Sequence, residues 1–396
     1  MLPNQHLERL IAAGVVVAPP GSPIPPGNIQ PASLDLRLGA VAHRLQCSFL
    51  PGRDPVEKRI NYLKMGEVDL RGRGGALEVG RSYLIPLQES LRLPSDMRGK
   101  ANPKSSTGRA DVFTRVITDH SYSFDEISPG YAGLLYLEVV PLSFPIWVRE
   151  DLSLNQVRLS IGRAALGDEE LKAAHERSPL LYDEGVARPV EELPVSSGLL
   201  LGVNLRGGKQ TRMGYRAKES PPLLDMTQVG GSSIDRYWER IRTTQPDCII
   251  LKSKRFYLLM SNEAVCIPPG FAAEMTAYDP TNGELRTHYA GFFDPGFGYD
   301  RGGGFSGSTA ALEVRAHDVD FMIEHGQRVC KLTFERMVEP PSQLYGEAGS
   351  NYQRQTETVG KHFRLPTRRS DGPPERPGDD GEPEQLPFFG LERELS

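Results

Sequence analysis

Proline and glycine are spread along the whole chain and divide it into short segments. The sequence has 33 prolines and 41 glycines among 396 residues. Both residue types mark turns, and proline interrupts helices. Helical spacing is clear only for Leu7, Leu10 and Ile11 and in the charged stretch 168–177. Elsewhere, short runs rich in β-branched, aromatic and aliphatic residues alternate with turns, which predicts a mainly β fold of barrel or sandwich type with few short helices. The clearest runs are residues 83–87, 134–140, 248–251 and 328–334.

The two halves of the chain contain the same features in the same order. Each half has a strand, a proline turn, a polar loop, a Pro-Gly-aromatic turn and a Leu-Glu-Val strand. Five ordered features are unlikely to match by chance, so we expect a tandem duplication. We place repeat 1 at residues 1–170, a linker at 171–197 and repeat 2 at 198–365. Residues 366–396 are rich in proline, glycine and charge, and we expect them to form a disordered tail.

Charge and composition restrict the class of partner. The 46 basic and 51 acidic residues nearly balance, so no overall basic field indicates nucleic acid, and positive charge must be concentrated locally to bind phosphate. The first ten residues lack the pattern of a signal peptide, and no apolar run approaches the ~20 residues that span a membrane. We therefore expect a soluble cytoplasmic protein. The four cysteines are scattered without zinc-site spacing, at Cys47, Cys248, Cys266 and Cys330.

Three segments together resemble the dCTP deaminase family. Residues 29–39 are similar to its N-terminal signature, residues 104–109 to its phosphate loop (usually Arg-Ser-Ser-x-x-Arg), and residues 345–355 to its C-terminal closing segment. The resemblance spans most of residues 1–360, and the double length is similar to the duplicated branch of that family. It implies two tandem dUTPase-like domains of the β-clip type, dCTP as substrate, and a homo-oligomer with sites at boundaries between repeats or subunits.

The polar loop from Lys104 to Arg109 has the groups that a triphosphate needs. About four negative charges require clustered donors. Lys104, Ser105, Ser106 and Arg109 supply two hydroxyls and two cations within six residues. The alternative is a polar turn with solvated charges. We expect Mg²⁺ to be held mainly by the phosphates, because this ion usually keeps its waters and takes few protein ligands.

The Leu-Glu-Val strands supply the candidate catalytic groups, Glu138 and Glu313. Deamination of cytosine requires attack of water at C4, protonation of N3 and departure of ammonia. The sequence lacks the His-x-Glu and Pro-Cys-x-x-Cys signature of zinc deaminases, so we expect no zinc and assign the proton transfers to a carboxylate. In the family that this chain resembles, this is the glutamate of the Leu-Glu strand. The alternative for either glutamate is a place on the solvent face of its strand.

The repeats differ in a way that favours complementary roles. Repeat 1 keeps the phosphate loop, whereas the matching loop of repeat 2, residues 276–283, lacks both serines and the arginine. Repeat 2 keeps a hairpin close to the family form at residues 288–297. We therefore expect repeat 1 to bind phosphates and repeat 2 to form the base pocket around Ala290 with Glu313. Because Glu138 is also intact, it stays an alternative.

Residues outside this central pair leave further alternatives open. Asp119 resembles the water-activating aspartate of dUTPases. It is expected either to support triphosphate hydrolysis or only to cap a turn. In the closing segment we expect Tyr345, Tyr352 and Gln355 to cover the nucleotide. Asn351 stands where the family commonly has lysine, which leaves Lys361 or Arg354 to compensate. Four residues of the N-terminal signature are interpreted as chiefly structural, namely Gln30, Ser33, Asp35 and Arg37. The rival functions are a bifunctional or dUTP-hydrolysing enzyme and a non-catalytic nucleotide sensor.

Overall fold

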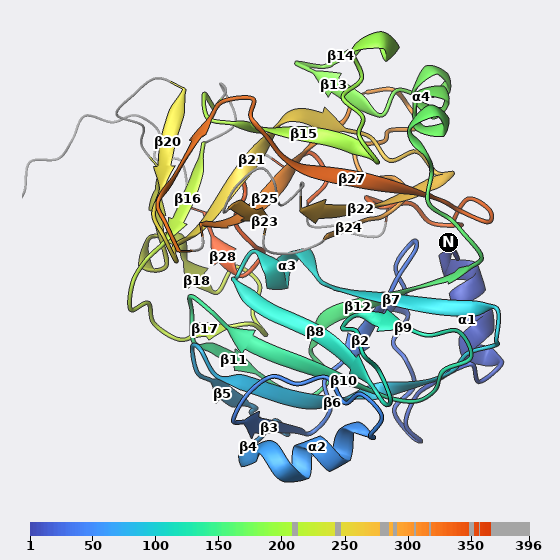
Figure 1. The fold of residues 1–396 in the computed structure, drawn as a ribbon, viewed down its shortest axis with the longest axis vertical. Helices are drawn as coiled ribbons and strands as arrows, with labels where there is room; N and C mark the ends of the chain where they lie inside the picture. Colours follow the sequence, from blue (N-terminus) through green and yellow to red (C-terminus); the bar gives the residue numbers. More distant parts are fainter. Residues whose placement is uncertain are drawn as a thin grey trace, which may run out of the picture. The chain divides into compact units, whose positions relative to one another are not determined.

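The chain folds mainly into β-strands in the computed structural model, as the sequence predicts (Figure 1). The structure describes residues 1–207, 213–241, 247–277, 285–287, 291–304, 306–316, 318–347, 352–355 and 357–365. Residues 1–365 form one unit, which contains both repeats. The predictions for Ala290, Asn351 and the tail at 366–396 lie outside the described residues.

Two sheets of repeat 1 enclose its core. One has the order β4 (Lys64–Asp69), β3 (Val41–Leu45), β6 (Ser82–Arg92), β10 (Ala132–Pro141) and β8 (Val112–Thr118), with β1 (Val16–Val17) also on β6. The other has the order β2 (Leu34–Arg37), β12 (Ser153–Ile161), β7 (Met97–Pro103) and β9 (Glu126–Ile127). Alternate side chains of both sheets meet in one buried cluster that includes Leu36, Ile85, Leu137 and Val157.

The strands of repeat 2 have the same neighbours in their sheets as the equivalent strands of repeat 1. The order β16 (Gly214–Ala217), β21 (Phe256–Val265), β25 (Ser308–Ala316) and β23 (Leu285–Thr287) matches β3-β6-β10-β8. The order β15 (Leu199–Asn204), β27 (Arg328–Arg336), β22 (Phe271–Ala277) and β24 (Gly291–Phe293) matches β2-β12-β7-β9. Registers agree as well, because Glu138 lies opposite Leu84 and Glu313 lies opposite Leu258. The two glutamates therefore occupy equivalent positions.

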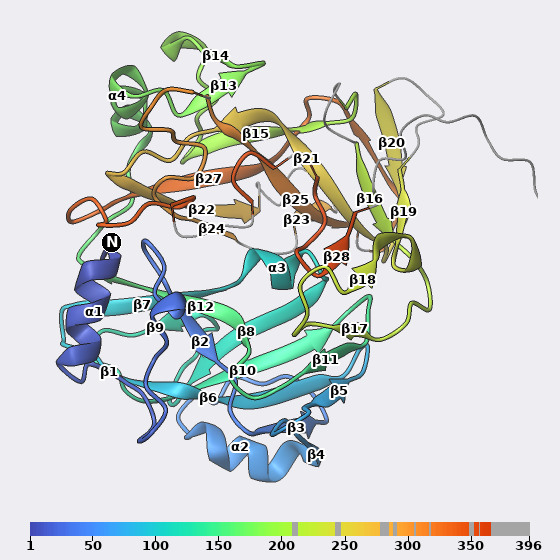
Figure 2. The same ribbon diagram turned by 180° about the vertical axis from the view of Figure 1, so that it is seen from behind.

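Two helices match the predicted helical stretches and two do not. Helices α1 (Asn4–Ala12) and α4 (Asp168–Arg177) form where helical spacing predicts them. Helix α2 (Val56–Leu63) was not expected; it covers the side of the first sheet that faces away from repeat 2 (Figures 1 and 2). Helix α3 (Ser105–Gly108) is a single turn formed by the polar loop, and it lies between the two repeats. Most of the expected linker is also structured, as the end of α4, β13 (Leu181–Asp183), β14 (Val186–Ala187) and the 3-10 turn η2 (Val190–Glu192).

An extension of repeat 2 packs on repeat 1 and holds the C-terminal segment. Strand β17 (Leu224–Asp225) pairs with β11 (Ile146–Val148), which also pairs with β5 (Gly75–Leu77). Strand β18 (Ser232–Ser233) pairs with β28 (Phe363–Arg364). The 3-10 turn η3 (Ile234–Arg236) and β19 (Trp238–Arg240) follow, and the aromatic rings of Phe144, Tyr237, Trp238 and Phe363 pack edge to face. The remaining elements are the 3-10 turn η1 (Pro26–Asn28), β20 (Cys248–Leu251) and β26 (Phe321–Glu324).

Polar contacts join the two repeats, and those of Arg158 are buried. Arg158 of β12 is fully buried and donates to the backbone oxygens of Ala273 and Phe293 and to Asp294 Oδ1, each at 2.9 Å. Lys100 Nζ donates to Glu274 Oε2 at 2.6 Å. A buried guanidinium needs several acceptors to offset its lost hydration, so these contacts fix how the repeats meet.

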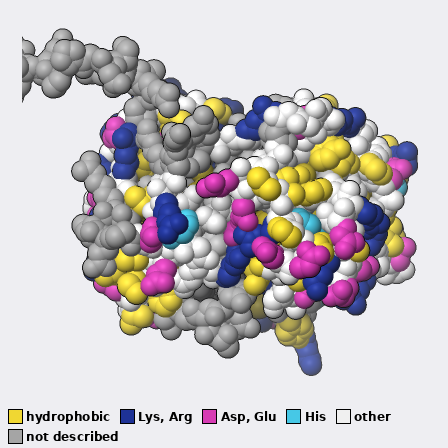
Figure 3. Space-filling model, turned by 90° about the horizontal axis from the view of Figure 1, so that it is seen from above, with side chains coloured by type: hydrophobic (Ala, Val, Ile, Leu, Met, Phe, Trp, Pro, Cys, Tyr) yellow, Lys and Arg dark blue, Asp and Glu magenta, His cyan; other side chains and the backbone are white. Residues whose placement is uncertain are grey.

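The surface carries charges of both signs. On the face seen in Figure 3, basic and acidic side chains are interspersed with hydrophobic ones. Among the described residues, no helix has the length and apolar character to cross a membrane.

Candidate active site

The phosphate loop of repeat 1 lies directly against Glu313 of repeat 2. A Cβ atom at Gly108 would overlap the carboxylate of Glu313, so a larger residue here would push the end of the Glu313 side chain away from the loop. Glu313 is on the face of β25 that alternates with the buried positions Leu312 and Val314. The junction thus brings together the two groups that the complementary hypothesis requires, and it does so within one chain.

A hollow at this junction is lined mainly by aromatic and apolar side chains around Glu313. The phosphate loop contributes Lys104, Ser105 and Arg109. Repeat 2 contributes most of the remaining wall, with Met275, Gly291, Phe292, Phe293, Phe297 and Ala311. Tyr345, Tyr352 and Gln355 of the closing segment also line the hollow. Among the described residues two carboxyl groups line this hollow, Glu313 and Asp294, and its apolar walls suit a flat, mostly apolar ring.

A second, more polar hollow adjoins the first. The two hollows share Lys104, Ser105, Phe292, Asp294, Tyr345 and Tyr352, whereas Ser106, Gln30, Asp35 and Lys361 line only the second. Its two carboxylates are already ion-paired, Asp35 with Lys104 and Asp294 with Arg158. Lys361 has no ion pair with a described residue, and burial together with the charge of Lys104 lowers the pKa of its amino group. The second hollow can therefore accept an anion.

Glu313 is in surroundings that disfavour its ionised form. Burial raises the pKa of Glu313 to about 8; the nearby guanidinium of Arg109 opposes this rise and the carboxylate of Asp111 adds to it. At neutral pH Glu313 therefore mostly carries a proton. A carboxyl group with a pKa near the working pH can both donate and accept protons in a reaction.

The closing segment packs on the loop instead of extending from the fold. The guanidinium carbon of Arg109 lies 3.8 Å from the centre of the Tyr352 ring, and Arg109 Nη1 donates to the backbone oxygen of Thr358 at 3.3 Å. The backbone N–H of Lys361 donates to the Tyr352 hydroxyl at 3.1 Å. Gln355 Nε2 donates to the backbone oxygen of Thr309 at 2.5 Å. The segment thus bridges the two repeats at the hollow.

Two predicted site residues lie elsewhere. Glu138 is buried, and its carboxylate accepts from Arg115 Nη2 at 2.6 Å, Ser82 Oγ at 2.8 Å and Ser48 Oγ at 3.1 Å. Asp119 Oδ1 accepts from the backbone N–H of Val56 at 2.7 Å, at the start of α2. Neither residue lines either hollow. Of the two alternatives for Asp119, the geometry matches the cap.

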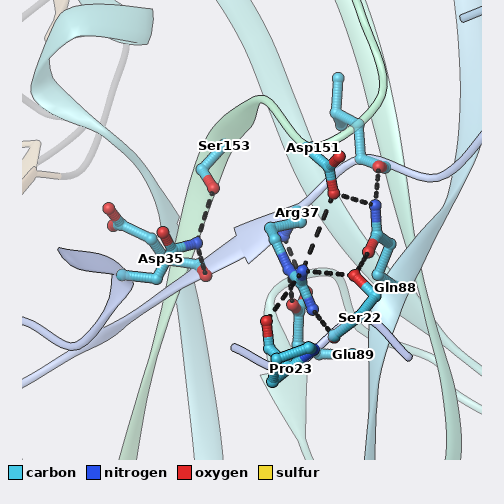
Figure 4. Close-up of polar contacts among 10 residues, drawn as sticks. Ser22, Pro23, Asp35, Arg37, Gln88, Glu89, Asp151 and Ser153 are labelled. Atoms are coloured by element: carbon cyan, nitrogen blue, oxygen red, sulfur yellow. Dashed lines mark hydrogen bonds and ion pairs between the residues drawn. The ribbon is translucent and has the colours of Figure 1, made fainter. Parts of the chain in front are cut away.

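The N-terminal signature has two different environments. Arg37 donates to Glu89 Oε1 at 2.6 Å and to Ser22, and it lies apart from Asp35 in Figure 4. Its partners are all in repeat 1, which fits the structural interpretation. Asp35 and Gln30, also read as structural, line the polar hollow instead. The family signature could have indicated Asp35 and Gln30 as site residues. For Phe292, Phe297 and Asp294, the sequence offered no indication beyond the hairpin motif.

Comparison with known proteins assigns the chain to a family. The sequence-family model for the N-terminal domain of 2'-deoxycytidine 5'-triphosphate deaminase matches residues 1–163. The family model for the C-terminal domain of the same enzyme matches residues 167–363. A crystal structure of 2'-deoxycytidine 5'-triphosphate deaminase from Agrobacterium tumefaciens is 44% identical, with a TM-score of 0.79, and covers 86% of this chain and 96% of its own. The chain belongs to the dCTP deaminase family.

Shorter dCTP deaminases match one part of the chain. The dUMP-forming dCTP deaminase of Acidothermus cellulolyticus is 28% identical over 150 residues, which are 37% of this chain and 73% of the relative. That of Clavibacter michiganensis subsp. michiganensis is 30% identical over 150 residues, 37% of this chain and 70% of the relative. These relatives are about half as long as this chain, so this dCTP deaminase family member has the double-length form.

Proposed function

We propose that this protein deaminates dCTP at the junction of its repeats. The cytosine ring enters the hollow that contains Glu313, and the triphosphate extends into the adjoining polar hollow. The observation that carries this proposal is the direct contact between Gly108 of the phosphate loop and the Glu313 carboxyl group. It puts a proton-transfer group next to the loop in a single chain.

The protonated state of Glu313 suits the first step of the reaction. The carboxyl proton passes to N3 of the base, and the carboxylate then takes a proton from the water whose oxygen bonds to C4. The regained proton goes to the 4-amino group, the C4–N bond breaks and ammonia leaves. Loss of the hydroxyl proton forms the C4 carbonyl and returns Glu313 to its protonated state. The sum is dCTP and water to dUTP and ammonia.

The phosphates are bound by the loop and by Lys361, which follows the closing segment. Ser105 and Ser106 supply hydroxyl donors, and Arg109 is fixed in position by the ring of Tyr352. Lys361 takes the place of the family lysine that Asn351 replaces, because it lines the polar hollow, whereas Arg354 is paired with Asp300 at 3.6 Å. Mg²⁺ arrives with the triphosphate. We expect the phosphates to hold this ion, because Mg²⁺ keeps several waters and takes few protein ligands.

The product we propose is dUTP, with dUMP as the second candidate. The names of the curated relatives favour dUMP, since those enzymes are called dUMP-forming. The position of Asp119 favours dUTP, because the residue that would activate a water for phosphate hydrolysis is at the start of α2 and does not line the polar hollow.

One assay tests both parts of the proposal. Purified protein is incubated with dCTP and Mg²⁺, and ammonia, pyrophosphate and the nucleotide product are measured together. We expect ammonia and dUTP in equal amounts without pyrophosphate. Equal ammonia and pyrophosphate would establish the dUMP-forming reaction instead, and tight binding of dCTP without ammonia would make the protein a nucleotide sensor.

The two equivalent glutamates provide a matched pair of variants. Glu313→Gln should lower kcat by more than about a hundredfold, the usual contribution of general acid–base groups. Glu138→Gln should retain most of the kcat, and its main effect should be a loss of stability. A protein inactivated only by Glu138→Gln would refute the assignment.

A further inference from the structure

A buried ion pair joins the two repeats beside Glu313, and the reaction described above does not use it. Arg315 of β25 donates to Asp111, which follows α3; the side chains are 13% and 0% exposed. Ser143 Oγ donates to the same carboxylate oxygen of Asp111 at 2.5 Å, and Arg315 also donates to the backbone oxygen of Lys254. The pair therefore connects the end of the phosphate loop to the strand that carries Glu313.

The backbone of Asp111 is in a conformation that disfavours a side chain. Its φ angle is +54°, in the left-handed region where glycine has no penalty and aspartate has one. Such a residue persists where its surroundings require it, and these positions concentrate at functional sites. Here the requirement is visible, because the carboxylate of Asp111 is the acceptor for Arg315 and Ser143.

The pair exists at only one of the two equivalent strands. Counting from the matched glutamates, the position of Arg315 in repeat 2 corresponds to Val140 in repeat 1. Repeat 1 instead neutralises its glutamate directly, through Arg115. The Asp111–Arg315 pair thus involves the strand of Glu313, the glutamate that lines the hollow, and has no counterpart on the strand of Glu138.

We propose that Asp111 and Arg315 are positioning residues for the deamination, holding Glu313 against the phosphate loop and keeping it protonated when substrate binds. This inference rests on the proposed function of Glu313. Among the described residues, the charged and titratable groups that act on Glu313 or line its hollow are Lys104, Arg109 and Asp111 from repeat 1, Asp294 from repeat 2, Tyr345 and Tyr352 from the closing segment, and Arg315 on its own strand. Among them Asp111 adds to the rise of the Glu313 pKa and Arg109 opposes it.

The charges predict opposite shifts for the two partners. Asp111→Asn removes a negative charge, which favours ionised Glu313, so the pH at which kcat/KM declines on the basic side should fall by roughly one unit. Arg315→Met leaves the charge of Asp111 unbalanced and should move that decline to higher pH. Arg315→Lys keeps the charge and should stay close to the parent protein. Asp96→Asn, at an exposed site, is the control for removing an acidic residue.

The experiment is a pH profile of kcat/KM for dCTP in these variants, with thermal unfolding to verify that each one is folded. Opposite shifts support the proposal, since damage to packing would lower activity at every pH without moving the decline. An unshifted decline in both folded variants would overturn it. If Asp111→Asn does not fold, the comparison of Arg315→Met with Arg315→Lys decides alone: equal profiles overturn the proposal. A parent protein that releases no ammonia from dCTP would instead refute the proposed function.

Discussion

At the scale of single residues, Glu138 and Glu313 show how neighbours decide what one motif does. Both follow a leucine in equivalent strands and lie opposite equivalent leucines. A guanidinium and two hydroxyls satisfy the carboxylate of Glu138, whereas Glu313 meets a glycine backbone and apolar walls. The carboxylate of Glu138 is thus held by side-chain partners within repeat 1, whereas that of Glu313 faces the hollow between the repeats.

The raised pKa of Glu313 should be measurable in the stability of the protein. Its pKa rises from an ordinary 4.5 to about 8, so between these values the folded chain holds a proton that the unfolded chain has released. The stability linked to this proton is complete at low pH and is lost as pH rises to about 8. The side chain of Glu313→Gln does not titrate, so this variant does not lose the proton-linked stability. From about pH 5 to about pH 8, its free energy of unfolding should therefore rise relative to that of the parent protein. Urea unfolding measures this difference, with Glu8→Gln as an exposed control; a difference that does not change with pH would contradict the shift.

Lys361 should contribute to binding of the triphosphate more than Arg354 does. A charge-assisted hydrogen bond contributes roughly 1.5–3 kcal/mol, so Lys361→Gln should raise KM for dCTP about ten- to a hundredfold with little change in kcat. Arg354→Gln is the matched control, because that side chain is 60% exposed and is near Asp300. Steady-state kinetics of the two variants provide the comparison. A larger effect in Arg354→Gln would show that the wrong cation has been assigned.

At the scale of elements, local sequence patterns predicted individual strands and helices. Contacts between segments that are far apart in the sequence could not be predicted. Turn residues predicted the strand at 248–251 and helical spacing predicted the helix at 168–177, with the bounds that β20 and α4 have. Motif matches led us to expect the loop 104–109 and Glu313 at one site, and the two are in contact in the structure. Arg115 could not be predicted to neutralise Glu138, because strand pairing across sequence brings them together. The same holds for Phe363, which follows the closing segment and packs against rings from residues 144, 237 and 238.

The unexpected helix α2 gives the two halves different surfaces at equivalent strands. In repeat 1 it packs with Leu84, Ile117 and Tyr136 on the face of the sheet that carries Glu138. In repeat 2 the corresponding face meets α3 of repeat 1. The sequence 56–63 is short and follows the turn-rich stretch 51–55, so its helical character was weak as a local signal.

At the scale of the whole molecule, these two surfaces predict one nucleotide site per chain. Repeat 2 receives its phosphate loop from repeat 1, but the glutamate face of repeat 1 is covered by α2, which no loop can displace without exposing the apolar side chains beneath it. Isothermal titration of Glu313→Gln with dCTP and Mg²⁺ should therefore give one nucleotide per chain. Sedimentation of the same sample gives its oligomeric state. We expect the same ratio for a monomer and for the homo-oligomer that the family resemblance implies, because the residues of the proposed site all come from one chain. Two nucleotides per chain would mean that Glu138 also faces a working pocket, and that the duplication kept both sites.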